Sequence, residues 1–494
     1  MKQTRTRRFG LSKSKITAFE QCPKRLWLAT HRPELAEQDE GAEARFATGN
    51  DVGAIACALH PGGFMVDAPN LTAALATTAS LITGGHPGPI FEATFEHDGV
   101  LVRVDVLERL EGGDWAAAEV KSSGSVKDYH RGDLATQVWV MREAGIDLQR
   151  ASIRHIDTSF VLTREGDYSG LFTDADLLGE LEAIIATRPA LVAEARAVLA
   201  GSEPEREMGD HCASPFPCEF SAYCSRHLPP GPEWPVTVLP NGGGKRWLEN
   251  GIADLLDLTE ANLNDRHARI LAATRDGKPF HDAEGARRAM KHWGWPRAWL
   301  DFETIAPAIP RWVGTRPYQQ IPFQFSLHLE RRGGRMIHHE FLSCDGSDPR
   351  RACAEALVEH IPEGATIIAY NAAFERRVLR DLAAAFPDLA AKLTAMAEAT
   401  VDLLPVARDH WYHRDQRGSW SIKAVLPTIA ADLDYGALEV KDGGDAQTAW
   451  VEAADPACEP LRREALKEAL KAYCARDTWA MVAVARALAG TAMA

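Results

Sequence analysis

Four acidic side chains and a tyrosine lie in three short segments in the second half of the chain. These segments read LDFET at 300–304, YNAAFERRVL at 370–379 and YCARD at 473–477. Each has the pattern of a strand or a helix, so the carboxylates come from separate elements of the fold. Such a set is hard to explain as a solvated surface, whereas metal-assisted hydrolysis needs several carboxylates that converge on one point. This constellation constrains the fold more than any other feature.

The spacing within each segment predicts which side chains lie together. Asp301 and Glu303 are two residues apart in the apolar run AWLDFET, so on a strand they point to the same face. Tyr473 and Asp477 are four apart in an amphipathic stretch at 461–488, so on a helix they lie one turn apart. Glu375 lies at the start of a helix-like segment that follows the apolar strand TIIAY.

The ordered set resembles the DnaQ-like 3′–5′ exonucleases of the tyrosine subclass (DEDDy), which have an RNase H-like fold. The resemblance implies that Mg²⁺ or Mn²⁺ would be held by four carboxylates, those of Asp301, Glu303, Glu375 and Asp477. It also implies that Tyr473 would orient the attacking water, and Asn371 matches the asparagine that commonly precedes the second motif. Glu375 stands where the family normally has aspartate, and its carboxylate can still bind a hard cation. Taken singly, a D-x-E strand or a Tyr-x-x-x-Asp helix pair is weak evidence.

The first half contains a second candidate site. The segment at 90–123 predicts three strands, with turns at Asp98-Gly99 and at Gly112-Gly113. Asp105 lies on the middle strand, and the third strand ends in Glu119-Val120-Lys121. Carboxylates on neighbouring strands can bind a cation, and a lysine beside them can orient or polarise water. The alternative is a simple ion pair between Glu119 and Lys121 at the edge of a sheet.

This arrangement resembles the RecB branch of the PD-(D/E)XK nucleases, which have a restriction-endonuclease-like fold. The resemblance implies Asp105 and Glu119 as metal ligands and four catalytic residues, namely Asp105, Glu119, Lys121 and Gln137. Met141 stands where the family has an aromatic residue, and Glu92 is a possible further helper. The early histidine of the family is not evident, because its expected surroundings hold Asp51 and Gly53, with His60 further on.

Four of the nine cysteines bracket this first-half segment. Cys22 precedes a proline near the start of the chain, and three more follow with five residues between neighbours, at Cys212, Cys218 and Cys224. The pattern resembles the iron–sulfur staple of RecB-family nucleases, which implies a [4Fe–4S] cluster on these four thiolates. The alternative is a structural Zn²⁺ site that uses the same thiolates, with His211 or His227 replacing one of them.

The formal net charge of −14 gives no general affinity for nucleic acid, but the first 25 residues are locally basic. This basic arm contains Lys2, Arg5, Arg7, Arg8, Lys13, Lys15, Lys24 and Arg25 against a single acidic residue, Glu20. Such a cationic stripe can bind phosphates, although a solubilising or targeting tail has the same composition. With no apolar run of about 18 residues and no secretion signal, the sequence predicts a cytoplasmic protein.

The 494 residues predict an α/β protein of two principal domains and a connector. A RecB-like domain at 1–228 would be followed by a Pro/Gly linker and helical connector at 229–290 and a DnaQ-like domain at 291–494, whose mixed sheet is flanked by helices. This order resembles a bacterial family that fuses the two nuclease modules. It implies a 3′–5′ exonuclease on single-stranded DNA or RNA with a second, RecB-like site. The alternative is a nucleic-acid-binding or assembly protein with inactive nuclease folds.

Overall fold

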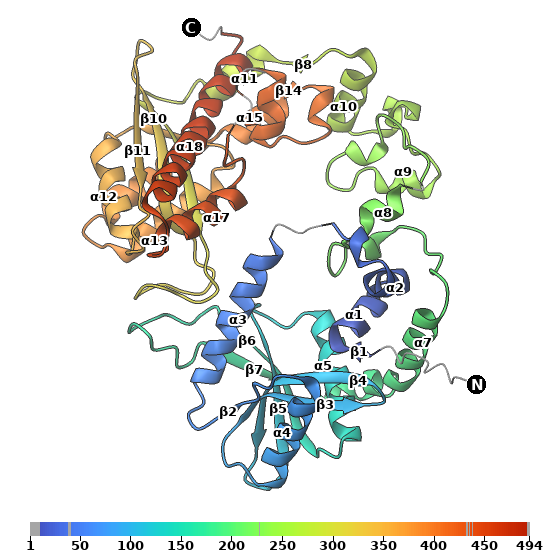
Figure 1. Cartoon of the computed structure of the whole chain (residues 1–494). Helices are drawn as coiled ribbons and strands as arrows, with labels where there is room; N and C mark the ends of the chain where they lie inside the picture. Colours follow the sequence, from blue (N-terminus) through green and yellow to red (C-terminus); the bar gives the residue numbers. More distant parts are fainter. Residues whose placement is uncertain are drawn as a thin grey trace. The chain divides into compact units, whose positions relative to one another are not determined.

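The computed structural model describes residues 10–37, 41–226, 228–430, 433, 435–436 and 438–491, without the side chains of Ala42 and Glu43. The chain forms two compact units, each built as a mixed sheet flanked by helices (Figure 1). The first unit comprises Met1–Pro229 and Pro307–Tyr318, and the second comprises Pro230–Ala306 and Gln319–Ala494. The predicted connector therefore groups with the second unit, and the segment 307–318 groups with the first.

The sheet of the first unit has the strand order β2-β3-β4-β5-β6-β7, with β1 paired to β4. The strands are β1 Leu11–Ser12, β2 Phe64–Met65, β3 Ile90–His97, β4 Val100–Arg109, β5 Trp115–Lys121, β6 Leu148–Ile156 and β7 Phe172–Asp176. The three strands predicted at 90–123 are confirmed as β3, β4 and β5, which pair antiparallel in sequence order. Strand β6 then pairs parallel with β5, so the sheet is mixed.

Helices of the first unit pack on this sheet around an apolar core that includes Val102, Val104 and Leu134. The helices are α1 Lys13–Gln21, α2 Pro23–His31, α3 Ala42–Ala58, α4 Leu71–Thr83, α5 Asp128–Glu143, α6 Leu178–Ile185, α7 Arg188–Ala200 and α8 Ser221–Ser225. Met141 is fully buried in this core.

The N-terminal segment LSKSKITAFEQCPKRLWL forms two helices that are separated at Cys22. Cys22 has extended backbone angles (φ −162°, ψ 118°), so α1 ends before it and α2 begins at Pro23. The residue before a proline is disfavoured in the helical region, because the proline ring clashes with its backbone. The interruption places Cys22 between two helices.

The sheet of the second unit has the order β11-β10-β9-β12-β13, and a small ribbon pairs β14 with β8. The strands are β8 Phe280–His281, β9 Arg297–Ile305, β10 Ile321–Glu330, β11 Met336–Leu342, β12 Thr366–Ala369, β13 Thr400–Asp402 and β14 Trp411–Tyr412. Strand β10 is antiparallel to both neighbours, whereas β9, β12 and β13 run parallel. The carboxyl ends of these three parallel strands therefore meet at one edge, where α/β folds commonly bind ligands.

Helices cover both faces of this sheet. The helices of the second unit, including those of the connector, are α9 Lys245–Glu249, α10 Asp265–Asp276, α11 Ala283–Met290, α12 Arg350–His360, α13 Ala373–Ala385, α14 Ala390–Ala399, α15 Leu403–His410, α16 Ile422–Val425, α17 Gly443–Ala454 and α18 Pro460–Leu488. Leu300 and Phe302 share an apolar core with residues of α12, α13 and α14. The opposite face contacts α18, which runs along the strands in Figure 1. The long helix predicted at 461–488 is confirmed. None of the described helices has the length and apolar character needed to cross a bilayer.

Candidate functional site

The acidic residues predicted in the second unit come together from a strand and two helices. Asp301 and Glu303 lie on β9, and strand alternation turns both away from the core that holds Leu300 and Phe302. Asp301, Glu303 and the neighbouring Cys474 each place one ligand atom within 4.8 Å of the others. The pairing predicted from their spacing on a strand is therefore present in the fold.

Glu375 approaches from the first turn of α13, and Tyr473 and Asp477 approach from α18. The carboxyls of Asp477, Glu303 and Glu375 are close enough to Asp301 to act on its ionisation. Glu303, Glu375 and Asp477 are each less than 10 % exposed, whereas Asp301 is partly buried. We call Asp301, Glu303, Glu375 and Asp477 the acidic cluster.

The pKa values of the acidic cluster are raised, mainly by burial and at Asp301 and Glu303 also by neighbouring carboxylates. Burial, followed by the charges of Asp477, Glu303 and Glu375, raises the pKa of Asp301 well above its ordinary value. Burial and Asp477 likewise raise the pKa of Glu303 to about 8, and burial raises the pKa of Glu375 to about 8. The pKa of Asp477 is also raised by burial. Groups of this kind concentrate at functional sites, because like charges are costly to hold together without a cation.

Two tyrosines and a lysine border the acidic cluster. The Tyr435 hydroxyl donates a 2.6 Å hydrogen bond to Asp477 Oδ1, and hydrogen bonds from Tyr435 and Tyr473 oppose the rise in the pKa of Asp477. The Lys423 ammonium lies 5.5 Å from the ring centroid of Tyr435 and 5.3 Å from that of Tyr473. It donates to the Lys441 carbonyl at 2.7 Å, which keeps a positive charge at the border of the cluster.

Glu375 has a buried carboxylate oxygen, Oε2, without a hydrogen-bond partner among the described residues. Its position depends on a turn that joins β12 to α13, where Asn371 has left-handed backbone angles (φ 68°). The Asn371 amide donates to Asp402 Oδ1 at 3.0 Å, and Asp402 also caps α15 through Leu404 at 2.9 Å. Asp402 therefore holds the turn that presents Glu375. A buried oxygen without a donor fits a cation ligand.

The four residues predicted in the first unit are also brought together. Asp105 lies on β4, Glu119 and Lys121 lie on β5, and Gln137 lies on α5. Lys121 Nζ is 2.8 Å from Glu119 Oε1, and Gln137 Nε2 donates to Glu119 Oε2 at 2.5 Å and to the Arg103 carbonyl at 3.0 Å. The Val120 amide donates to Asp105 Oδ2 at 2.6 Å.

An unpredicted member of this site is Lys13, the first residue of α1, whose ammonium forms an ion pair with Glu119 Oε1. Burial alone would raise the pKa of Glu119, but the charges of Lys13 and Lys121 lower it to about 2. Burial and the charge of Glu119 raise the pKa of Asp105 to about 8. Glu92 lies on β3 between Phe91 and Ala93, which pair with Val106 and Val104 of β4. It has a left-handed backbone (φ 54°), and burial raises its pKa. Backbone strain of this kind clusters at functional sites.

His60 and His130 of the first unit have different surroundings. His60 pairs with Glu108 Oε1 at 2.8 Å and contacts Arg154, so it is engaged away from Asp105 and Glu119. His130, near the start of α5, is 1 % exposed, and burial followed by the charge of Lys121 lowers its pKa to about 4. His130 is therefore a neutral imidazole at neutral pH, within electrostatic range of the site. Asp51 and Gly53 lie on α3.

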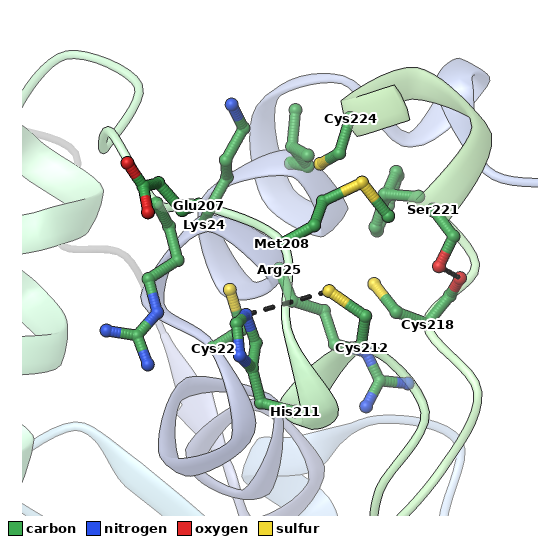
Figure 2. A pocket seen from close by; sticks show the side chains of 13 residues that line it. Cys22, Lys24, Arg25, Glu207, Met208, His211, Cys212, Cys218, Ser221 and Cys224 are labelled. Carbon is green, nitrogen blue, oxygen red and sulfur yellow. Dashed lines mark hydrogen bonds between the residues drawn. The ribbon is translucent and has the colours of Figure 1, made fainter. Parts of the chain in front are cut away.

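The four predicted cysteines line one pocket. Figure 2 shows the side chains of Cys22, Cys212, Cys218 and Cys224 around a common space, together with Met208. The pocket has an empty volume of about 340 Å³, part of it open to solvent. Two hydrogen bonds of 2.7 Å from Gln21 Nε2, to the carbonyls of His211 and Phe216, tie the end of α1 to the loop that holds the later cysteines.

The four sulfur atoms are spread more widely than ligands of a single ion. Among the described residues, no three of these sulfurs lie within 4.8 Å of one another. Tetrahedral zinc with Zn–S bonds of about 2.3 Å places its sulfurs roughly 3.8 Å apart. His211 Nε2 contacts Cys212 Sγ at 3.7 Å, as the dashed line in Figure 2 shows, and His227 lies outside the described residues. Burial raises the pKa of the Cys218 and Cys224 thiols.

The basic arm is partly engaged in ion pairs. Lys24 pairs with Glu203 at 2.8 Å, Arg25 pairs with Glu219 at 2.9 Å, and Lys13 pairs with Glu119. Lys15 donates to the Gly10 carbonyl at 3.0 Å. Lys2, Arg5, Arg7 and Arg8 lie outside the described residues. In the described part of the arm, Lys24 and Arg25 therefore join α2 to the segment 203–219 through these ion pairs.

Sequence reasoning missed Tyr435, Lys13 and His130 as neighbours of the two sites. Tyr435 lies in the segment DLDYGALEV, which matches no motif, and Lys13 had been grouped with the basic arm. Only contacts across the fold distinguish these residues from ordinary surface or core positions.

Comparison with known proteins adds one finding. Residues 298–421 match a family described as a domain of unknown function (DUF2779). This match spans β9 through the segment before α16 and includes Asp301, Glu303 and Glu375. No curated protein matches the chain.

Proposed function

We propose that this protein is a metal-dependent nuclease that hydrolyses phosphodiester bonds of nucleic acid. Its second unit would be an RNase H-like, DnaQ-type 3′–5′ exonuclease acting on single strands of DNA or RNA. The observation that carries this proposal is the acidic cluster, in which four carboxylates from one strand and two helices lie together in a largely buried place. A fold that only bound nucleic acid would gain nothing from holding these like charges together.

The residues fit a pair of divalent cations, Mg²⁺ or Mn²⁺. The carboxylates are hard oxygen donors, and burial raises their pKa values, with a further contribution from neighbouring carboxylates at Asp301 and Glu303. Among the described residues, Glu375 Oε2 is a buried acceptor without a donor. The cluster members Asp301, Glu303, Glu375 and Asp477 would hold the ions. When bound, the cations would supply electrostatic stabilisation of the phosphate and activation of water.

The chain's own residues would position the reactants. Tyr473 remains a neutral phenol, because burial and the charges of Asp477 and Glu303 raise its pKa, so it can orient a water by hydrogen bonding. Tyr435 holds one oxygen of Asp477 and so fixes the orientation of that carboxylate. Lys423 places a positive charge at the border, where it can approach a phosphate of the strand. Hydrolysis adds water across the terminal P–O bond and releases a nucleotide.

The first unit would be a RecB-like PD-(D/E)XK nuclease domain that cuts or presents the strand. The assembly of Asp105, Glu119, Lys121 and Gln137 supports this role, with Asp105 and Glu119 as the residues that would hold a cation. Lys121 contacts both Glu119 and Asp133. Its ammonium therefore lies beside the Glu119 carboxylate, which would also bind the cation.

A [4Fe–4S] cluster would occupy the cysteine pocket. Cys22, Cys212, Cys218 and Cys224 offer four thiols in one place, and the spread of their sulfurs favours a group larger than one Zn²⁺ ion. The cluster would join α1 to a loop roughly 190 residues later, and closing so long a loop stabilises the folded state. Its role would be structural support of the first unit.

The exonuclease is tested with purified full-length protein, Mn²⁺ and single-stranded DNA or RNA labelled at its 5′ end. We expect stepwise shortening from the 3′ end, and loss of at least a hundredfold in rate in Asp301→Asn and in Asp477→Asn, because removing a charged ligand weakens metal binding. Glu468→Gln is the matched control, since Glu468 lies exposed on the same helix as Asp477 and pairs with Lys471.

A wild-type protein that binds the strand but never cleaves it, across metals and substrates, would instead establish the nucleic-acid-binding alternative. Cleavage that persists in the Asp301→Asn, Asp477→Asn double variant, and disappears on adding Asp105→Ala and Glu119→Ala, would assign the activity to the first unit.

A further inference from the structure

We propose that Lys13 is a substrate-binding residue of the first-unit site. In the metal-free protein its ammonium pairs with Glu119. When a divalent cation binds Glu119 instead, the Lys13 ammonium moves to a backbone phosphate of the nucleic acid. This inference rests on the proposed function of the first unit. It assigns to the N-terminal helix a role beyond the Asp105, Glu119, Lys121 and Gln137 set.

The contacts of Glu119 show why Lys13 must move. Lys13 and Lys121 both contact Oε1 of Glu119, while Gln137 donates to Oε2. Glu119 is 3 % exposed, so there is no open side from which a cation can approach it. A cation can reach Oε1 only when one of the two ammonium groups withdraws.

Lys13 is the ammonium that can leave. Lys121 is held by a second carboxylate, Asp133, at 3.4 Å, whereas within the described part of the chain Glu119 is the carboxylate with which Lys13 pairs. The side chains of Lys13 and Lys121 are 22 % and 21 % exposed, so solvent can receive either ammonium, and the second carboxylate contact of Lys121 is what distinguishes them. Long lysine side chains readily place their ammonium in water while the stem stays packed.

The helix that carries Lys13 stays fixed while the side chain moves. Thr17 Oγ1 donates to Asp133 Oδ1 at 2.6 Å, and Glu20 pairs with Arg188 at 2.8 Å. At the other end, Gln21 holds the cysteine loop. The released ammonium therefore remains beside Glu119, where it faces the negative charge of a bound phosphodiester.

This role makes two opposite demands on one side chain. As a competitor for Glu119, Lys13 weakens cation binding in the absence of substrate. As a phosphate ligand, it strengthens binding of the nucleic acid. A purely structural ion pair would change both properties in the same direction, so the two measurements together separate the roles.

The experiment uses the full chain carrying Asp301→Asn and Asp477→Asn, so that the second unit does not bind the metal. Mn²⁺ affinity is measured by calorimetry, and binding of a single-stranded oligonucleotide is measured as a function of salt in Ca²⁺. We expect Lys13→Ala to bind Mn²⁺ several-fold more tightly and the oligonucleotide more weakly, with a salt slope reduced by about 0.7, as for one lost phosphate contact.

Lys13→Arg should restore the salt slope, and Arg164→Ala should leave both properties unchanged, because Arg164 is an exposed residue of the first unit that pairs with Asp167 at 2.6 Å. The circular dichroism and melting temperature of every variant are compared with those of the parent. If Lys13→Ala lowers the Mn²⁺ affinity or leaves it unchanged, the proposed transfer is overturned while the metal site stands. If neither the parent nor Lys13→Ala binds Mn²⁺ more tightly than a Glu119→Gln variant, the proposed metal site of the first unit falls as well.

Discussion

At the scale of single residues, the two candidate sites differ in how their charge is compensated. In the first unit, two lysines contact Glu119 and hold its pKa at about 2. In the second unit, Lys423 is set back beyond two tyrosine rings, and the pKa of Glu303 rises to about 8. Ionised carboxylates are therefore less stabilised by the protein in the second site than in the first, and a bound cation would stabilise them more there.

Tyr435 is expected to tune the second site through Asp477. Replacing Tyr435 by phenylalanine removes the 2.6 Å hydrogen bond but keeps the ring against Lys423. Loss of a group that orients a metal ligand typically costs about tenfold in affinity. We expect Mn²⁺ affinity and exonuclease rate to fall by about that factor in Tyr435→Phe, measured by calorimetry and by strand shortening.

The control is Tyr412→Phe, which removes another buried tyrosine hydroxyl of the second unit, the acceptor for the Gly418 amide at 3.2 Å. An equal loss in both variants would show that the effect comes from general destabilisation rather than from the orientation of Asp477.

At the scale of elements, short helices and turns decide where the functional groups lie. Pro23 ends α1 at Cys22, and the turn through Asn371 directs α13 so that Glu375 enters the acidic cluster. Helix α5 presents Gln137 to Glu119, and its first turn is closed by the Lys127 amide, which donates to His130 Nδ1 at 3.1 Å. Each of these local features supports a contact between residues that are far apart in the sequence.

His130 is expected to make the first unit sensitive to acid. Its pKa is about 4 in the folded protein and about 6.5 as an unperturbed group, because burial and then the charge of Lys121 disfavour the imidazolium. Between pH 6.5 and pH 4, His130 binds a proton in the unfolded chain but not in the folded chain. The contribution of neutral His130 is therefore complete above pH 6.5 and is lost as the pH falls toward 4.

In His130→Gln this loss should disappear, and a glutamine at that position of a helix can still accept from the capping amide. Denaturant unfolding at several pH values should show that the difference in free energy of unfolding, wild type minus His130→Gln, becomes smaller as the pH falls from 6.5 to 4. A difference that is constant over this range contradicts the prediction.

At the scale of the whole molecule, the chain is divided into two compact units, and each contains one of the two candidate sites. The cysteine pocket belongs entirely to the first unit, because Cys22, Cys212, Cys218 and Cys224 all precede Pro229. A cofactor there should stabilise that unit in particular, since it joins the start of the unit to its end.

We expect purified wild-type protein to be brown, with absorbance typical of iron–sulfur proteins, and Cys218→Ser to lose this colour. Calorimetry should show that the transition of the first unit falls by several degrees, because a constraint on a long loop has been removed. Exonuclease activity of the second unit should remain. Ser221→Ala, a change in the same pocket that removes no thiol, is the control. A colourless, zinc-loaded wild type would refute the iron–sulfur assignment.

Much of the local structure could be predicted from the sequence. The alternation within AWLDFET predicts a strand, and the four-residue spacing of Tyr473 and Asp477 predicts a helix. Both elements are present as predicted. Turn residues at Asp98-Gly99 and Gly112-Gly113 likewise delimited β3, β4 and β5 correctly. These features follow from the periods of strand and helix, which depend only on neighbouring residues.

The contacts between distant segments were decided by the tertiary structure. Lys13 and Glu119 are 106 residues apart, and Tyr435 and Asp477 are 42 apart, so no local period links them. Their proximity depends on how sheets and helices pack, and packing also determines burial and hence the pKa of each acid. By itself, the sequence determined which side chains share a face of one element. Only the folded chain determined which faces meet, because long-range packing is a property of all the elements together.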